Sequence, residues 1–161
     1  MTVSEYNRAV DLYSDGIYRF ILKNTRNEDK AKDLVQDTFE KLWLKLETVT
    51  NEKVKSYLFT TAYHTFIDSF RRDGRIEGMD NIKADRYHHS EQYSDLQEVL
   101  NAAINRLPEA QRSVILLRDY EGYSYEEIAE ITGLSESQVK VYIFRGRAYL
   151  KSYIGNLESV L

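Results

Sequence analysis

The chain has 161 residues, of which 42% are apolar and 30% charged, and its formal net charge is −4. This length fits one domain of ordinary size or two small ones. The absence of cysteine excludes a disulfide framework and thiolate chemistry. The longest aliphatic run is 114–117, far too short to span a membrane, and the first twenty residues lack the apolar core of a signal peptide. We therefore expect a cytoplasmic protein without membrane insertion.

Residues 1–73 are predicted to form three helices. The sequence has one proline and seven glycines, which favours long helices over many short strands. Apolar residues recur every three or four positions from Val10 to Ile21, from Ala31 to Leu46 and from Val54 to Thr65. For the third helix, Asn51 is the expected N-cap, with Glu52 in the first turn. An all-α fold follows, beginning with a three-helix domain.

Residues 74–95 differ in composition from the segments on either side. Apolar residues have about half their usual density there, charged residues are frequent, and Gly74 and Gly78 are expected to interrupt any helix. We interpret this segment as a flexible linker between two small helical domains, 1–73 and 96–161. In the second domain, Leu96–Arg106 is the predicted first helix, and Pro108 is expected at the first position of the next.

A helix-turn-helix is predicted near the C-terminus. Ser124 with Glu127, and Ser135 with Gln138, have the spacing of two capping boxes, each of which begins a helix. The turn between the two helices has three residues and contains Gly133, which can adopt a positive φ at little cost. Basic residues outnumber acidic ones only in 135–161, so the acidic segment before it is followed by a basic one.

The second helix of this motif is the candidate DNA-reading element. Its N-terminal residues would lie at base edges in the major groove, and its free amide groups favour a phosphate. The candidates for base contacts are Ser137, Gln138 and Val141; Ser135, Lys140, Arg145 and Arg147 are candidates for contacts to DNA, the cations for phosphates or guanine. The alternative is a plain helical hairpin with a solvated basic surface.

Two helices of the first domain carry aromatic residues whose role the sequence leaves open. Phe59, Tyr63, Phe66 and Phe70 form a stripe that ends beside Arg71 and Arg72, the composition of a surface that stacks single-stranded bases. From that segment alone, packing in a domain core is the favoured reading. In the preceding helix, Phe39 and Trp43 lie beside a polar side formed by Asp33, Gln36, Asp37 and Glu40. That helix could bind a partner's helix or be an ordinary amphipathic helix.

Taken together, these motifs resemble a known family. The run Asp33–Phe39 followed by Leu42-Trp43 is similar to sigma region 2.2, and Val54–Phe59, continuing to Arg72, is similar to regions 2.3 and 2.4. Leu107–Arg112, Tyr120–Ala129 and Gly133–Ser135 resemble region 4. The chain as a whole resembles a minimal extracytoplasmic-function (ECF) RNA polymerase sigma factor of the sigma-70 family.

The resemblance implies roles that composition does not. The helix with Asp33, Gln36, Asp37, Phe39, Glu40 and Trp43 would bind the clamp helices of bacterial core RNA polymerase. The loop 49–55 and the helix after it, with Asn51, Lys55, Tyr63, His64, Arg71 and Arg72, would open and read the minus-ten promoter element. The helix-turn-helix would read the minus-thirty-five element as duplex, and the linker would run towards the RNA exit path. An anti-sigma factor is an implied partner, whereas no cofactor and no small-molecule substrate is implied.

Two departures from the family pattern bear on promoter sequence. Tyr63-His64 stands where the family usually has Arg-Asn, and 138–142 reads Gln-Val-Lys-Val-Tyr instead of a common Thr-Val-Lys-Ser-Arg. Both changes lower the local positive charge. Weak binding to DNA in the absence of polymerase is therefore expected.

Two other functions are open to the sequence. The first is a free-standing helix-turn-helix regulator that binds a symmetric operator as a dimer. The second is an enzyme or a metal protein. Its only histidine pair, His88-His89, lies in the polar segment, where solvated side chains are the favoured interpretation. His64 is interpreted as a surface or capped polar residue and not as a general base, since no nucleophile–base constellation appears. We therefore expect neither catalysis nor a bound metal.

Overall fold

The computed structural model describes residues 1–76 and 95–160, and every regular element in those two ranges is helical. The elements are α1 (Val3–Thr25), α2 (Glu28–Leu44), α3 (Val54–Ile76), α4 (Asp95–Arg106), α5 (Glu109–Ile115), the π-helix η2 (Leu116–Tyr120), α6 (Tyr125–Thr132) and α7 (Glu136–Val160). Helices α1–α3 form one compact unit, and α4, α5, η2 and α7 belong to a second, together with α6 as far as Ala129. The predicted all-α fold with two helical domains is confirmed.

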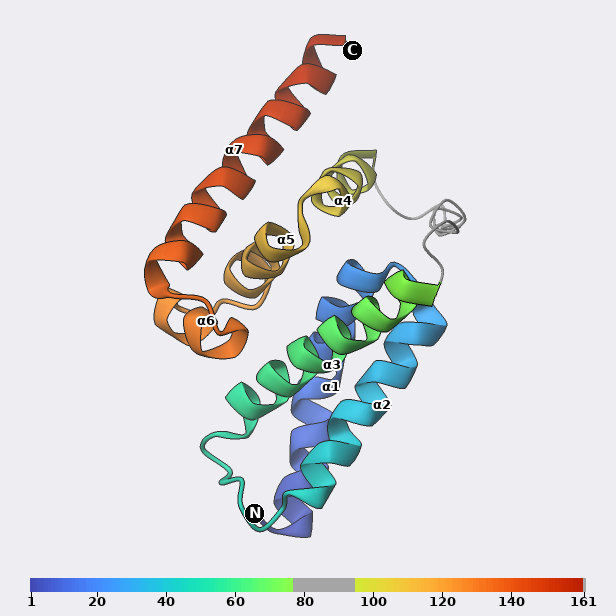
Figure 1. Cartoon of the computed structure of the whole chain (residues 1–161), viewed down its shortest axis with the longest axis vertical. Helices are drawn as coiled ribbons and strands as arrows, with labels where there is room; N and C mark the ends of the chain where they lie inside the picture. Colours follow the sequence, from blue (N-terminus) through green and yellow to red (C-terminus); the bar gives the residue numbers. More distant parts are fainter. Residues whose placement is uncertain (77–94, 161) are drawn as a thin grey trace. The chain divides into compact units, whose positions relative to one another are not determined.

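The first unit is a three-helix bundle in which each helix packs against the other two (Figure 1). Its core is apolar and fully enclosed: Ile17, Phe20, Leu42, Leu58 and Phe66 are at most 1% exposed. Helix α1 begins with a capping box between Thr2 and Glu5, and α2 begins at the N-cap Asn27. Burying this apolar surface supplies most of the stability of such a small domain.

Helix α3 begins later and ends later than the sequence predicts. Residues 51–53 form a turn, the amide of Lys53 donates to the carbonyl of Thr50, and the first helical bond runs from Tyr57 to Lys53. The prediction that Asn51 caps this helix is therefore wrong, because the chain has not yet entered helical geometry at that residue. The expected interruption at Gly74 is also wrong, because a single glycine costs a helix only about 1 kcal/mol and α3 continues to Ile76.

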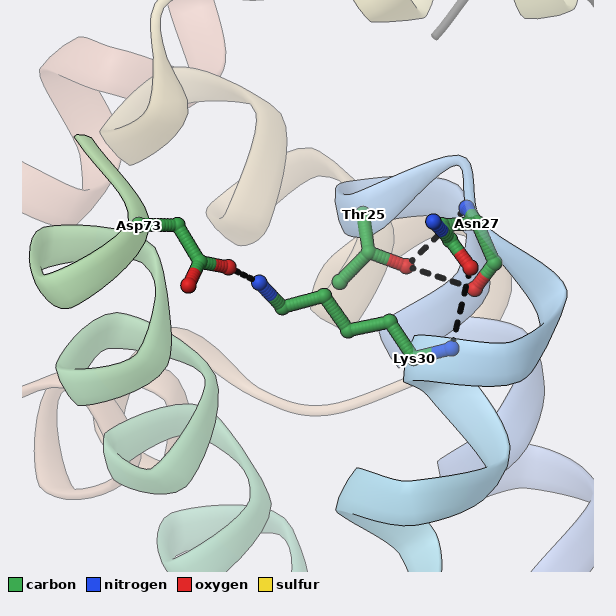
Figure 2. Close-up of polar contacts among 4 residues, drawn as sticks. All are labelled: Thr25, Asn27, Lys30 and Asp73. Carbon is green, nitrogen blue, oxygen red and sulfur yellow. Dashed lines mark hydrogen bonds and ion pairs between the residues drawn. The ribbon is translucent and has the colours of Figure 1, made fainter. Parts of the chain in front are cut away.

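Polar contacts link the junction of α1 and α2 to the end of α3 (Figure 2). The backbone amide of Asn27 donates to the Thr25 hydroxyl at 3.4 Å, and Asn27 Oδ1 accepts from the Lys30 amide at 3.0 Å. The Lys30 ammonium pairs with the Asp73 carboxylate of α3. These contacts hold the start of α2 near the end of α3.

In the second unit, α5 and α4 both pack against α7. Pro108 is the N-cap of α5 and not its first residue, one position from the prediction. At Gly146 of α7, helices α5 and α7 approach so closely that an added Cβ would lie 3.0 Å from Cγ1 of Ile115 in α5. The predicted helix to about Tyr120 is confirmed in extent, although its last turn, η2, is a π-helix.

None of the helices within 1–76 and 95–160 is long and apolar enough to cross a membrane. The predicted linker, 74–95, lies outside the described residues except for the end of α3 and Asp95.

Candidate polymerase and nucleic-acid interfaces

The helix-turn-helix has the local geometry that its sequence predicts. Ser124 caps α6 with Glu127 in a capping box, and Ser135 and Gln138 exchange hydrogen bonds of 2.9 and 3.1 Å at the start of α7. Gly133 ends α6 at φ 80°, a left-handed conformation in which other residues are strained. The turn of three residues, 133–135, is therefore confirmed.

Helix α7 buries one side and exposes the other. Val139 and Ile143 are at most 2% exposed, and Ile128 of α6 is also fully buried. All the residues predicted to contact DNA in this region are exposed: Ser135, Ser137, Gln138, Lys140, Val141, Arg145 and Arg147. Because the buried side is fixed by packing, this exposed side is presented as a rigid surface.

Two cationic side chains and one aromatic ring form a cluster at the start of α6 that local sequence patterns do not indicate. The guanidinium of Arg118 stacks over the ring of Tyr125 at 4.5 Å, and the ammonium of Lys140 lies 5.7 Å from the same ring. Arg118 also donates to the carbonyl of Tyr123 at 2.9 Å. Cation–π contacts of this kind hold flexible basic side chains in place.

Arg147 is held by an acidic residue from η2. Its Nε and Nη2 donate to the two carboxylate oxygens of Asp119, at 3.2 and 2.5 Å. This hydrogen bonding raises the pKa of Arg147 above its already high ordinary value. Lys140, in contrast, pairs with Glu136 one turn earlier on α7, at 3.6 Å, and both of these side chains are about half exposed.

In the first unit, α2 exposes a polar side that ends in apolar residues. Asp33, Gln36, Asp37 and Glu40 are exposed along this side, and Trp43 is 47% and Leu44 76% exposed at its end. Phe39, predicted as a contact for polymerase, is only 7% exposed and packs in the bundle. The ring of Trp43 meets Tyr6 of α1 edge to face at 5.1 Å, so this exposed ring is held in a defined orientation.

The residues predicted to read the minus-ten element fall into two groups. Asn51 is exposed in the turn before α3, and Lys55 is exposed in the first turn of that helix. His64 and Arg71 are exposed seven residues apart, two turns along the same side of the helix, with Arg72 exposed beside them. Nine residues separate Lys55 from His64, which places them on opposite sides of α3.

Tyr63 and its aromatic neighbours are mainly core residues. Phe59 and Phe66 are 1% exposed and Tyr63 is 8% exposed, whereas Phe70 is 53% exposed. Packing in the core, the reading favoured from that segment alone, is thus confirmed for the first three of the four aromatics. Phe70, whose ring lies 5.8 Å from that of Phe66, is the one left at the surface.

Among the described residues there is no group of three or more side chains that could hold a metal ion. His88 and His89 lie outside those residues, and His64 is exposed on α3.

The fold and these surfaces define a two-domain helical protein with a C-terminal helix-turn-helix and an N-terminal bundle that exposes an acidic and aromatic helix side. Residues 9–76 match the family "Sigma-70 region 2" and residues 97–150 match "Sigma-70, region 4". The chain belongs to the sigma-70 family of RNA polymerase sigma factors, in its ECF group.

Similar proteins span nearly the whole chain. RNA polymerase sigma factor YlaC of Bacillus subtilis is 34% identical over 148 residues, which is 86% of each chain. ECF RNA polymerase sigma factor SigM of the same organism is 29% identical, with 94% of each chain covered. The solved sigma factor RpoE, in complex with the anti-sigma factor NepR from Bartonella quintana, is 30% identical with a TM-score of 0.80, and the match covers 95% of this chain and 98% of that one. As a sigma factor, the protein directs promoter recognition together with core RNA polymerase.

Proposed function

We propose that the two units divide the work of promoter recognition between them. The α2 side from Asp33 to Trp43 binds core polymerase, the start and exposed side of α3 act on the minus-ten element, and α7 reads the minus-thirty-five element in duplex DNA. The observation that carries this proposal is the exposed side of α7. Every residue of the helix-turn-helix that was predicted to contact DNA is exposed there, and the start of the helix is capped by Ser135.

The charge distribution supports dependence on polymerase. The chain has a net charge of −4, so its long-range field does not attract DNA, and basic residues outnumber acidic ones only in the C-terminal segment 135–161. Affinity for phosphates rises with the number of cations that contact them. We therefore infer that polymerase supplies much of the affinity for promoter DNA.

The proposal extends to partners and location. The similar protein RpoE was solved in complex with an anti-sigma factor, which supports an anti-sigma partner for this chain as well. The protein would act where bacterial RNA polymerase acts, in the cytoplasm, and would carry out no catalysis of its own. A free-standing dimeric regulator is not favoured, because residues 9–76 match sigma region 2.

The test is transcription in vitro from a library of templates randomised at the two promoter elements. The full chain with bacterial core RNA polymerase should produce transcripts that start at a defined distance from a common pair of sequences. The chain without polymerase should bind the selected templates weakly, with an affinity that falls steeply as salt rises. The absence of specific transcripts from every template would contradict the proposal.

A further inference from the structure

Two large apolar side chains are exposed on the DNA-reading helix. Phe144 is 74% exposed and Val141 is 43% exposed, while Val139 and Ile143 of the same helix are buried. Leaving a phenylalanine ring in water forgoes about 1.5–3 kcal/mol relative to burying it. Phe144 therefore contributes little of this amount to the domain core and Val141 only part of it, so the exposed surface of both is available to a ligand.

Val141 and Phe144 lie on the same side of α7. They are three positions apart, which is close to one helical turn, and the buried Val139 and Ile143 face the other way. The rise between the two is about 4.5 Å at 1.5 Å per residue. Successive base pairs of duplex DNA are about 3.4 Å apart, a spacing small enough for the two side chains to reach neighbouring base pairs.

The surroundings of this pair favour a polyanionic ligand. Lys140 and Arg145, the residues adjacent to them in sequence, and Arg147 are all exposed. Lys140 and Arg147 pair with Glu136 and Asp119 of the same unit, but both cationic side chains remain about half exposed. Duplex DNA supplies phosphates to the cations and, inside the major groove, an apolar group for the two side chains.

We propose that Val141 and Phe144 contact the 5-methyl groups of thymines on neighbouring base pairs of the minus-thirty-five element. Thymine is the only standard base that presents a methyl group in the major groove, and apolar side chains are its usual partners. The inference rests on the proposed function of α7 and adds to it the bases that are read. It also gives a role to Phe144, which the sequence did not single out as a site residue.

The experiment replaces single thymines by deoxyuridine, which removes the methyl group and changes nothing else in the base pair. Templates are synthesised with one substitution at a time in the minus-thirty-five element selected as described above, and transcription by the full chain with core polymerase is measured at subsaturating protein. At each contacted thymine, we expect the loss of one methyl contact to lower transcription about fourfold. The sensitive positions should lie on neighbouring base pairs.

Variants connect the methyl groups to the side chains. In Val141→Ala and Phe144→Ala, the thymine and deoxyuridine templates should give equal transcription at the position that each side chain contacts. Leu12→Ala is the matched control, because Leu12 of α1 is also apolar and is 58% exposed. With Leu12→Ala, the ratio of transcription from the thymine template to that from the deoxyuridine template should equal the ratio for the wild-type protein.

Three results would overturn the inference while leaving the proposed function intact. They are transcription insensitive to deoxyuridine at every position, sensitivity that persists unchanged in both alanine variants, and a loss of transcription in those variants without any sensitivity to deoxyuridine. The last result would indicate that the apolar pair binds a protein instead. Failure to obtain specific transcription from any template would count against the proposed function itself.

Discussion

Arg147 and Asp119 lie 28 residues apart in the chain and are joined by two hydrogen bonds, Nε to Oδ2 and Nη2 to Oδ1. The carboxylate occupies only one edge of the guanidinium. An arginine has five N–H donors in a planar fork, so the two bonds to Asp119 do not use all of them. The π-helical turn η2 supplies Asp119 for this contact.

We predict that Asp119→Asn weakens binding of the holoenzyme to its promoter. The carboxylate holds a long side chain in one orientation, and immobilising such a chain on binding costs about 0.5–1.5 kcal/mol. Affinity should therefore fall by a factor of about 2 to 12. Electrostatics alone predicts the opposite sign, because the change removes a negative charge near DNA.

Salt titration separates positioning from loss of a contact. In Asp119→Asn the number of phosphates contacted is unchanged, so the slope of log affinity against log salt should equal that of the wild-type protein. Arg147→Gln removes one phosphate contact and should reduce the slope by about one. Tighter binding by Asp119→Asn would show that the carboxylate masks Arg147.

A second prediction concerns the turn between α6 and α7. Gly133 has φ 80° and nothing within 4 Å of an added Cβ, so only its backbone conformation requires glycine. Gly133→Ala should lower the free energy of unfolding by about 1–2 kcal/mol, and Gly133→Asn should cost less because asparagine tolerates this conformation. Urea unfolding followed by circular dichroism measures both.

Gly155 provides the matched control for this substitution. It lies in the interior of α7, with open space around an added Cβ and no positive φ. Gly155→Ala should raise the free energy of unfolding by about 0.5–1 kcal/mol. If both alanine variants shifted stability in the same direction, the turn conformation would not be the cause.

Local signals in the sequence predicted the helix-turn-helix well, because capping boxes and a turn glycine act within a few residues. Ser124, Gly133 and Ser135 each lie where their chemistry indicates. The pairing of Arg147 with Asp119 could not be predicted in this way, because it joins side chains of α7 and η2 that lie 28 residues apart in the chain. The stacking of Arg118 over Tyr125 likewise follows from the path of the chain between η2 and α6.

The same distinction explains the mixed result in the first unit. A 3.6-residue period assigns a helix side but does not set how wide the buried stripe is, so Phe39 and Tyr63, at its margin, could be core or surface. The structure places both in the bundle, at 7% and 8% exposure. The start of α3 was misplaced because a capping residue type at Asn51 does not exclude a turn before the helix.

A third prediction separates polymerase contact from core packing on α2. Trp43→Ala should weaken binding to core polymerase by about 2 kcal/mol or more, the size typical of an interface hot spot. Because that ring is 47% exposed, the loss of stability should be small. Phe39→Ala should instead lower the free energy of unfolding by about 3–5 kcal/mol, as for other buried phenylalanines.

Leu44 is a matched control for that comparison. It is adjacent to Trp43 but 76% exposed, so Leu44→Ala tests whether apolar exposure at the end of α2 is sufficient for binding. Polymerase affinity is measured by titrating fluorescently labelled chain with core enzyme, and stability by urea unfolding. Unchanged affinity in Trp43→Ala would remove this residue from the proposed interface.

The last prediction concerns the exposed side of α3. His64 and Arg71 share that side, while the ring of Tyr63 is buried next to His64, at 5.4 Å between ring centres. In the open complex, His64→Ala and Arg71→Ala should lower the permanganate reactivity of minus-ten thymines, which reports strand separation, without changing stability. A lost stacking or phosphate contact of about 1–3 kcal/mol is enough to reduce the open fraction severalfold.

Tyr63→Ala should instead destabilise the bundle, because a core ring is removed, whereas Tyr63→Phe should retain both the fold and the opening of promoter DNA. If Tyr63→Phe abolished strand opening while the bundle remained folded, the buried tyrosine would have to leave the core to reach DNA, and the surface assigned here to His64 and Arg71 would be incomplete.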